Sequence, residues 1–378
     1  MNMVVWKKLG DIANITIGEF VHRDKQNPNS KFPVYNGGTS YTGFYDQYNN
    51  TGNKIVISAR GYAGFVNRVL VNYWAGNSSY SIDVNDDNAI WHYVYYYLKN
   101  EQFNIMAMQQ KGGGLAAISK KQIQELLIPI PSFSEQQRIV SILDTFISSI
   151  ENLKEQIAQR RKQYNWFLDY AYYPDKYKLL EAAERGDVIV KTFDEIGTFT
   201  RGRRFVRTDI VSDGVPCIHY GDMYTYYGVW ADKTPTHLTK DLAEKLRFAS
   251  KGDVIIVGAG ENDMDIGVGV AWLSEEDVVV HDACYIFKHN INPKYFSYYL
   301  RSMNYHLQIK MGVVDGKICS ISAKELGRTI IPIPSISEQQ RIVSILDTFE
   351  ASIANLEAQL AQREKQYEYY RNKLFTFE

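Results

Sequence analysis

The chain contains a long internal repeat, and this repeat constrains its fold more than any other feature. Residues 127–164 return at 330–367, a shift of 330 − 127 = 203 residues, and Ser134 to Phe146 matches Ser337 to Phe349 without a change. An unchanged run of this length in two distant parts of one chain marks a duplicated unit. The protein is therefore expected to consist of two copies of one structural unit.

Each copy of the repeat is expected to begin a long helix. The prolines at 129, 131, 332 and 334 favour extended backbone before the helix, and Ser134 with Gln137, like Ser337 with Gln340, fits a capping box. Pro174 is expected to end the first helix near Tyr173, and the second runs almost to the C-terminus, so each has about 40 residues and a length of about 60 Å. Apolar residues recur at spacings of three and four, at Ile139, Ile142, Phe146, Ile150, Leu153, Ile157 and Tyr164, and at Ile342, Ile345, Phe349, Ile353, Leu356, Leu360, Tyr367, Tyr370 and Leu374.

Two arrangements fit these apolar seams. Because the seams are nearly the same, the helices are expected to pack on each other within the chain, and the two-fold relation between duplicated units makes the pair antiparallel. The alternative is that each helix packs separately on its own domain.

The segments before the two helices are related only weakly. They share short β-rich runs broken by Gly and Asn and one later helix, which predicts a mixed α/β domain in each half. The predicted fold is α+β, with two such domains joined by an antiparallel coiled coil of two long helices and an internal pseudo-two-fold symmetry. The expected ranges are 1–133 for the first domain, 134–173 for the first helix, 174–190 for a linker, 191–336 for the second domain and 337–378 for the second helix.

Composition excludes several classes of protein. The net charge of −1 argues against coating nucleic acid by bulk electrostatics, so any DNA contact must come from local basic patches. Cys217, Cys284 and Cys319 are widely spaced and suggest no disulfide framework. The start of the chain does not resemble a signal peptide and no apolar run is long enough to span a membrane, so a cytoplasmic location is expected.

The repeated signature resembles a known family. The pattern IPIPS-x-SEQQRIVSILD stands at 128–144 and again at 331–347, and the first domain contains the run Ile57-Ser58-Ala59-Arg60-Gly61. These residues resemble the specificity (S) subunits of type I restriction-modification systems, over nearly the whole chain.

That resemblance implies a non-catalytic subunit with two target-recognition domains, each reading one half of a split, asymmetric sequence in double-stranded DNA. It implies that the helices fix the gap between the half-sites and that methylase subunits, two per chain, dock around them. It also implies that restriction (translocase) subunits join the complex, and that S-adenosylmethionine, ATP and Mg²⁺ are bound by the partner subunits.

Candidate DNA contacts are basic, amide and aromatic side chains in glycine-rich turns, because such groups reach phosphates and base edges. In the first domain they are Asn36, Arg60, Tyr62 and Lys111. In the second domain they are Arg201, Arg203, Arg204, Arg207, His219, Tyr220 and Lys317. The second domain has Ala259 where the first has Arg60, so an arginine contact is not expected there.

Candidate contacts with partner subunits lie at the two helix starts. Glu135, Gln136 and Arg138 are repeated as Glu338, Gln339 and Arg341, although capping alone does not require each of these residues. Charged residues beside the seam, among them Arg160, Arg161 and Lys162 and their counterparts Arg363, Glu364 and Lys365, are expected mainly to keep the helices soluble.

Motifs for other chemistry are incomplete. Val254 to Gly260 lacks the third glycine of a dinucleotide-binding turn, and no phosphate-binding GxxxxGK[ST] loop occurs. Asn292-Pro293-Lys294-Tyr295 departs from the adenine-methylase motif, and Cys217, His219, His281 and Cys284 are not expected to bind metal. Two alternatives stay open, a free-standing DNA-binding regulator and a nuclease with an unrecognised centre.

Overall fold

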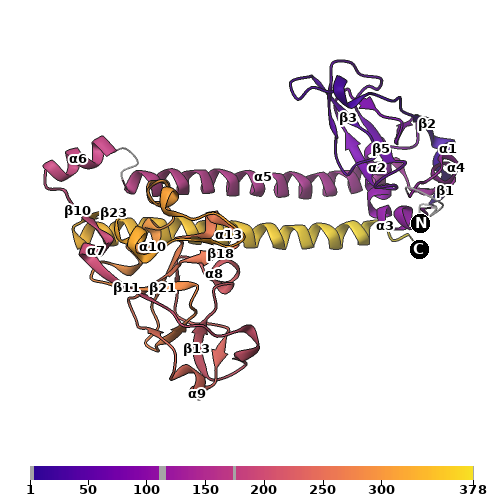
Figure 1. Cartoon of the computed structure of the whole chain (residues 1–378). Helices are drawn as coiled ribbons and strands as arrows, with labels where there is room; N and C mark the ends of the chain where they lie inside the picture. The colour runs from indigo at the N-terminus through magenta and orange to yellow at the C-terminus, as the bar shows by residue number, and fades with distance from the viewer. Residues whose placement is uncertain (1–3, 110–115, 173–175, 378) are drawn as a thin grey trace. The chain divides into compact units, whose positions relative to one another are not determined.

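A computed structural model describes residues 4–109, 116–172 and 176–377. Its contacts divide the chain into two compact units. Unit 1 comprises residues 1–154 together with 358–378, and unit 2 comprises residues 155–357. Each unit thus contains one α/β lobe and a stretch of both long helices, α5 (Phe133–Ala171) and α13 (Ile336–Leu374) (Figure 1).

The first lobe is built on a four-stranded antiparallel sheet with the order β2-β8-β5-β6. The lobe also contains a three-stranded sheet with the order β4-β3-β7. The antiparallel pair β1-β9 joins the start of the lobe to its end. The elements are β1 (Val5–Lys8), α1 (Leu9–Ile12), β2 (Ala13–Ile17), η1 (Arg23–Lys25), β3 (Phe32–Tyr35), β4 (Gly43–Tyr45), β5 (Lys54–Ser58), β6 (Val66–Val69), β7 (Trp74–Ala75), β8 (Ser79–Val84), α2 (Trp91–Asn100), α3 (Gln102–Ala107), α4 (Lys120–Gln124) and β9 (Leu127–Ile130).

The second lobe has the same plan with additions. Its main sheet has the order β11-β21-β17-β19-β14, its second sheet is β12-β15-β13-β20-β16, and β10 pairs with β23. The strands are β10 (Val188–Thr192), β11 (Gly197–Arg201), β12 (Ile210–Val211), β13 (Val215–Ile218), β14 (Trp230–Ala231), β15 (His237–Leu238), β16 (Phe248–Ala249), β17 (Val254–Val257), β18 (Ala259–Gly260), β19 (Gly269–Trp272), β20 (Val278–Val280), β21 (Cys284–His289), β22 (Cys319–Ser320) and β23 (Ile330–Pro334). The helices are α6 (Lys176–Glu184), α7 (Phe193–Ile196), η2 (Arg207–Asp209), α8 (Asp222–Thr225), α9 (Lys240–Ala243), η3 (Asp263–Asp265), α10 (Pro293–Tyr299), α11 (Met303–Ile309), η4 (Lys310–Gly312) and α12 (Ala323–Gly327).

Strand pairings show that the lobes are copies of one fold. In the first lobe β5 pairs with β6 and β8, and in the second lobe β17 pairs with β19 and β21, all antiparallel. Both lobes also contain a parallel pair, β3 with β7 and β13 with β20. The central strands β5 and β17 are mostly or fully buried, because sheet neighbours and helices cover them, so their sequences read as continuous apolar runs.

Serine residues before the expected caps start the two long helices. The backbone N–H of Glu135 donates to Oγ of Ser132 (3.4 Å), and that of Glu338 donates to Oγ of Ser335 (3.3 Å). The capping boxes expected at Ser134 and Ser337 are therefore wrong, because each helix begins at the residue before them, Phe133 and Ile336. Part of the expected linker is also helical, as α6.

The apolar residues of each long helix divide between two tasks. Near its start, α5 buries Ile139 and Leu143 in the core of the first lobe, and α13 buries Ile342 and Leu346 in the core of the second. Further along, the helices pack on each other, as expected for the coiled coil, and only the first part of each helix packs on its own lobe.

The helix pair runs antiparallel within each unit. In unit 1, Phe146 of α5 stacks on Tyr370 of α13 with ring centroids 5.4 Å apart, and Lys154 forms an ion pair with Glu364. The partner number falls as the α5 number rises, which defines the antiparallel direction. In unit 2, Arg161 pairs with Glu357 and Phe167 packs on Phe349, which shows the same direction.

The end of each long helix packs on the lobe that precedes the other helix. In unit 1, Phe375, just beyond the end of α13, contacts the rings of Tyr93 and Tyr97 in α2. In unit 2, Tyr172 at the end of α5 is buried, and its hydroxyl donates to the carbonyl of Tyr295 in α10 (2.6 Å). Each unit is therefore closed by helix segments from both halves of the chain.

Candidate DNA interface

Three loops of the first lobe meet at one end of its sheets. They follow β3, β5 and β7, and hydrogen bonds tie them together: Gly37 N donates to Ser79 Oγ (3.0 Å), Ser58 Oγ donates to Gly38 O (2.8 Å), and Tyr62 N donates to Gly37 O (3.0 Å). Gly37 has a φ of +81°, and a Cβ there would lie 2.6 Å from the carbonyl oxygen of Arg60. Glycine is needed at this crossing because two backbones approach closely.

The structure brings three candidates of the first lobe to these loops. The Arg60 side chain is exposed, and Tyr62 is 59% exposed, so both can reach a ligand. Asn36 is half-buried, and its Oδ1 accepts from the backbone N–H of Ser78 (3.0 Å), so this oxygen serves the loop itself. Lys111 lies outside the described residues.

The corresponding end of the second lobe carries arginines held by backbone carbonyls. Arg201 Nε donates to Asp282 O (2.7 Å), Arg203 Nη1 donates to Lys245 O (2.7 Å), and Arg247 Nη1 donates to Arg201 O. Arg204 and Arg207 are exposed close by in the chain. Among the described residues, the other N–H groups of these three guanidinium groups have no hydrogen-bond partner, which suits contact with phosphate oxygens.

Burial changes the interpretation of His219. This residue is 5% exposed, its ring centroid lies 4.6 Å from that of His281, and its Nδ1 accepts from Gly221 N (3.3 Å). Burial and the neighbouring His281 lower the pKa of His219, and burial lowers the pKa of His281. The ring of His219 is therefore buried against His281 and not presented at the surface of the loop, so its burial does not support the expected base contact.

Tyr220 and Lys317 lie on the same end of the second lobe. The Tyr220 ring is partly buried against His281, at a centroid distance of 5.3 Å. Lys317 is exposed on a loop whose ends are joined by a bridge between Val314 and Ser320. Ser320 in turn pairs with Ala259, which places this loop beside the turn that follows β17.

Backbone hydrogen bonds align the loops of the two lobes residue by residue. Ile118 N donates to Ala59 O, and Ile321 N donates to Gly258 O, each at the corresponding position. Arg60 bridges to Ala117, and Ala259 pairs with Ser320. The structure therefore places Ala259 where the first lobe has Arg60, which agrees with the substitution noted in the sequence.

Three basic residues at these ends were missed from the sequence. Arg23 and Lys25 form the exposed turn η1, which corresponds to η2 with Arg207, and Arg247 joins the arginine cluster of the second lobe. Arg247 is 46 residues from Arg201, so only the fold brings them together. Arg23 could have been found from the sequence by its similarity to Arg207, because each of the two arginines follows the first strand of its lobe's main sheet, β2 or β11.

The two helix starts share an exposed ion pair. Arg138 donates to both carboxylate oxygens of Glu135 (2.8 and 2.6 Å), and Arg341 donates to both oxygens of Glu338 (2.8 and 2.7 Å). The arginines hold the pKa of both glutamates below the ordinary value. Beside these pairs, Phe133 is 50% and Ile336 is 68% exposed. We call Phe133, Glu135 and Arg138, and separately Ile336, Glu338 and Arg341, the helix-start surfaces.

Gln136 and Gln339 do not belong to these surfaces. Gln136 is buried, donates to Asn88 O (2.7 Å) and Pro131 O (3.0 Å), and accepts from Ile90 N (2.9 Å). Gln339 is buried in the same way and accepts from Asn292 N (3.0 Å). Their expected contact with a partner is corrected to an internal role, which is to lock each helix start to its own lobe.

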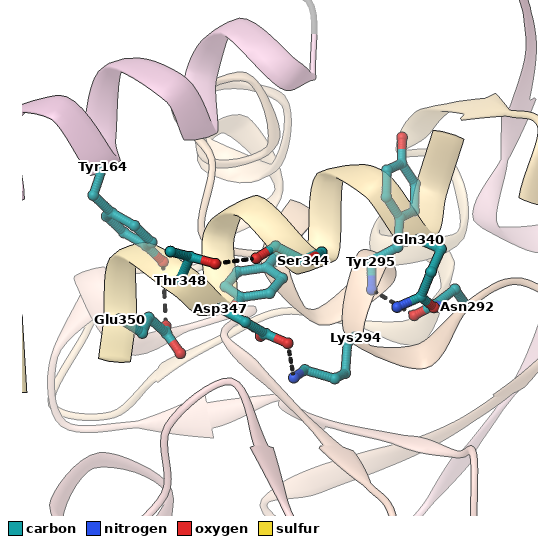
Figure 2. A network of polar contacts seen from close by, with 10 residues as sticks. Tyr164, Asn292, Lys294, Tyr295, Gln340, Ser344, Asp347, Thr348 and Glu350 are labelled. Carbon is teal, nitrogen blue, oxygen red and sulfur yellow. Dashed lines mark hydrogen bonds and ion pairs between the residues drawn. The ribbon is translucent and has the colours of Figure 1, made fainter. Parts of the chain in front are cut away.

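Polar contacts also fix the long helices to the lobes further along. Figure 2 shows Lys294 of α10 paired with Asp347 of α13, Asn292 bonded to Gln340, and Tyr164 of α5 bonded to Glu350 of α13. The first lobe uses the equivalent Asp144, which accepts from Arg68 Nη1 (3.2 Å) and from the hydroxyl of Tyr96. The contacts of Asp347, Gln340 and Asp144 hold each lobe at a fixed position on its helix, whereas the bond between Tyr164 and Glu350 joins the two helices.

Other kinds of site find little support among the residues that the structure describes. No group of three or more His, Cys, Asp or Glu side chains there is placed to hold a metal ion. Cys217, Cys284 and Cys319 are buried free thiols. No helix in the described ranges is both long and apolar enough to cross a membrane.

Comparison with known proteins defines the class to which this fold and these loops belong. The family model described as "Type I restriction modification DNA specificity domain" matches residues 3–160 and again residues 186–364, once per lobe. The chain therefore belongs to the family of type I restriction-modification DNA specificity proteins, as the repeated signature indicated.

Individual relatives agree with this assignment. The specificity subunit of the Escherichia coli type I restriction enzymes EcoR124I and EcoR124II is 30% identical over 308 residues, which cover 78% of this chain and 72% of the relative. The crystal structure of the type I restriction-modification S subunit from M. genitalium has a TM-score of 0.64 at 21% identity and covers 100% of this chain and 98% of its own. The crystal structure of the HsdS subunit from Thermoanaerobacter tengcongensis has a TM-score of 0.50 at 16% identity and covers 98% of this chain and 96% of its own. These two structures show that the fold is shared.

Proposed function

We propose that this chain reads an asymmetric, two-part DNA sequence, with one half-site contacted by each lobe, inside a complex with methylase subunits. The lobes supply sequence recognition, and the long helices fix the number of base pairs between the half-sites. The chemical steps belong to the partner subunits, which are expected to carry S-adenosylmethionine, ATP and Mg²⁺.

One observation carries the proposal. The loops at the sheet ends have equivalent backbone hydrogen bonds in the two lobes, yet their side chains differ. Arg60 of the first lobe corresponds to Ala259 of the second. Glu19 corresponds to Arg203, because Glu19 N donates to Ala75 O in the same way as Arg203 N donates to Val280 O. A common frame with different side chains at its tips is what two readers of different sequences require, because bases are distinguished by side-chain donors and acceptors.

The helices support a fixed gap. Each long helix has 39 residues and is continuous from the residues of one unit into those of the other. At 1.5 Å per residue, a helix of this size is about 58 Å long, which compares with about 34–36 Å per turn of DNA. A continuous helix pair of this length makes the spacing of the half-sites a part of the specificity.

The helix-start surfaces support docking of two methylase subunits. Each surface exposes a large apolar residue, Phe133 or Ile336, beside the same glutamate–arginine ion pair. Exposed apolar residues next to ordered polar groups are typical of protein interfaces. Because the two surfaces repeat in a chain whose lobes have diverged, we infer that two copies of one partner bind them.

The test is co-expression of the chain with its methylase, followed by mapping of methylated adenines across a genome. The proposal predicts one motif of two unlike half-sites separated by a gap of constant length and any sequence. A continuous motif, a palindrome, or a gap that varies from site to site would contradict it. DNA binding that is equally strong and specific without the methylase would favour a free-standing regulator.

A further inference from the structure

The aromatic seam between the two long helices does not distinguish one helix from the other. In unit 1, Phe146 packs on Tyr367 and Tyr370, and in unit 2, Phe349 packs on Tyr164 and Phe167. These contacts occupy the same positions of the repeat, with a shift of 203 residues. Two copies of α5 from different molecules would make nearly the same aromatic contacts, as would two copies of α13. The seam alone therefore permits pairing with a second copy of the chain.

Four charged residues break this equivalence. Lys154 pairs with Glu364 in unit 1 at 3.0 Å, and Arg161 pairs with Glu357 in unit 2 at 2.5 Å. A shift of 203 residues takes Lys154 to Glu357 and Arg161 to Glu364. Both ion pairs therefore use the same two positions of the repeat, which are basic in α5 and acidic in α13.

Pairing of like helices would reverse the sign of these contacts. An antiparallel pair of two α5 helices places Lys154 opposite Arg161 twice, and a pair of two α13 helices places Glu357 opposite Glu364 twice. We propose that these four charges make α5 and α13 of one chain pair with each other in preference to their own copies in a second chain. The inference concerns assembly of the chain and does not depend on the proposed DNA function.

Neighbouring charges do not offer the same discrimination. Glu151 and Glu155 also lie on α5, but in the described ranges no ion pair joins either of them to α13, and Glu155 accepts instead from Gln159 one turn away (3.0 Å). The four paired side chains are 43–63% exposed, so each pair is individually weak and sensitive to salt. The preference arises because two attractions are replaced by two repulsions when like helices meet.

This preference has a consequence for the lobes. A pair of two α5 helices would bring together two copies of the first lobe, and a pair of two α13 helices would bring together two copies of the second. Pairing of α5 with α13 keeps the two unlike lobes in one assembly, although the apolar seam would accept the alternatives.

The test compares the wild-type chain with a charge-exchanged chain, K154E/R161E/E357K/E364R. A protease site is inserted at Gly186, which is exposed, has a φ of +78° and has open space where a side chain would lie. Equal amounts of both chains are cut, unfolded together in urea and refolded. Native mass spectrometry with one isotope-labelled chain then identifies which first half is bound to which second half.

If charge does not matter, half of the re-formed complexes will combine halves from different chains. We expect those mixed complexes to fall about tenfold below half at low salt, because each contains two like-charge contacts, and to rise toward half in 1 M salt, where the screening length is about 3 Å. Wild-type first halves are also expected to pair with exchanged first halves but not with each other. Mixed complexes at one half in low salt would overturn the proposal.

A matched control uses Glu151 and Glu155. A chain carrying E151K/E155K changes charge on the same helix without altering the four paired positions, so its mixture with wild type should give close to half mixed complexes. A second measurement needs no refolding of cut chains. In the intact protein, K154E/R161E is expected to lower the urea midpoint and the four-fold exchange to restore it. Equal midpoints for K154E/R161E and wild type would also overturn the proposal.

Discussion

Arg60 differs from the better-anchored arginines of the candidate interface. Guanidinium groups of Arg201, Arg203 and Arg247 donate to backbone carbonyls, whereas the exposed Arg60 guanidinium makes no hydrogen bond or ion pair within the part of the chain that the structure describes. Its backbone is nevertheless fixed by the crossing with Gly37 and the bridge to Ala117. A free guanidinium on a rigid backbone is suited to a guanine, which accepts two hydrogen bonds from arginine.

Substitution Arg60→Ala is therefore expected to relax the methylated motif at one guanine of one half-site. Loss of a bidentate contact lowers discrimination at that base by about 1–3 kcal/mol. The other half-site should stay unchanged, because Ala259 stands at the equivalent position of the second lobe. Motif mapping after co-expression with the methylase measures this, with Arg60→Lys as the comparison that keeps the charge. An unchanged motif for Arg60→Ala would exclude Arg60 as a base contact.

Gly37 supports Arg60 through its own conformation. Gly37→Ala is expected to destabilise unit 1 by about 1–2 kcal/mol, because alanine is disfavoured at a φ of +81° and its Cβ would meet the carbonyl oxygen of Arg60. Urea unfolding measures the change. Gly38→Ala is the matched control: a Cβ there lies 3.2 Å from the oxygen of Ser40 and φ is not positive, so the loss should be smaller. Equal losses of unfolding free energy in the two variants would show that the close approach of Gly37 to the Arg60 backbone is not the cause.

His289 makes unit 2 sensitive to acid. Burial lowers the pKa of His289 to about 4, and its ring packs between Phe287 and Phe296, at centroid distances of 5.4 and 5.0 Å. The unfolded chain has a histidine pKa of about 6.5, so between these values it binds a proton that the folded chain does not. The contribution of neutral His289 to stability is complete above about pH 6.5 and is lost as the pH falls.

The urea midpoint of wild type should therefore fall between pH 7 and pH 5 more than that of His289→Phe, which keeps an aromatic ring and removes the titrating group. Measurement of both proteins at both pH values tests this. His219 and His281, whose pKa values burial also lowers, remain in both proteins and affect them alike. An equal fall in both proteins would show that His289 does not contribute.

At the scale of elements, the sequence predicts the long helices better than their first residues. The proline pairs and the apolar spacing place both helices within four residues of their observed limits, but Ser132 and Ser335 cap them in place of the expected serines. Local spacing cannot decide between two nearby serines, because the choice depends on how the preceding strand enters the helix. The sequence also did not predict α6, because this helix depends on the packing of its Leu179 against Val188 of β10.

The candidate site is predictable only where signals are local. Glycine-rich turns identify the loops with Arg60 and Tyr62, because such turns are visible in the sequence itself. Burial of Gln136, Gln339 and His219 is not visible in the same way, since their surroundings come from distant segments such as Asn88, Asn292 and His281. For the same reason, Arg247 joins Arg201 only after folding.

The helix-start surfaces yield a prediction for assembly. The double charge reversal Arg138→Glu with Arg341→Glu is expected to abolish co-purification with the methylase, because each surface then carries two like charges. Circular dichroism checks that the helices remain. The control exchanges both partners in each pair, E135R/R138E with E338R/R341E, so that the local ion pairs return in reversed order. Assembly that survives the double reversal would show that the methylase binds elsewhere.

At the scale of the whole molecule, the length of the helix pair is expected to set the gap between the half-sites. Insertion of seven residues into both helices, after the equivalent positions Ala158 and Ala361, adds about 10.5 Å at 1.5 Å per residue. At about 3.4 Å per base pair, the gap in the methylated motif should grow by about three base pairs with unchanged half-sites. Insertion into α5 alone breaks the register of the ion pairs and should reduce assembly. An unchanged gap after the double insertion would show that the length of the helices does not set the spacing of the half-sites.

Each lobe is expected to read its own half-site, and duplication of one lobe tests this expectation. Residues 5–130 are replaced by the equivalent 189–333, since Val5 pairs with Ile130 as Ile189 pairs with Ile333. The graft keeps an aromatic partner for Phe375 at the end of α13, because Tyr295 in the second lobe corresponds to Tyr93, which Phe375 contacts in the first. Motif mapping should then return one half-site of the wild-type sequence repeated in inverted orientation. Persistence of the original asymmetric motif, or a motif with neither original half-site, would contradict the account.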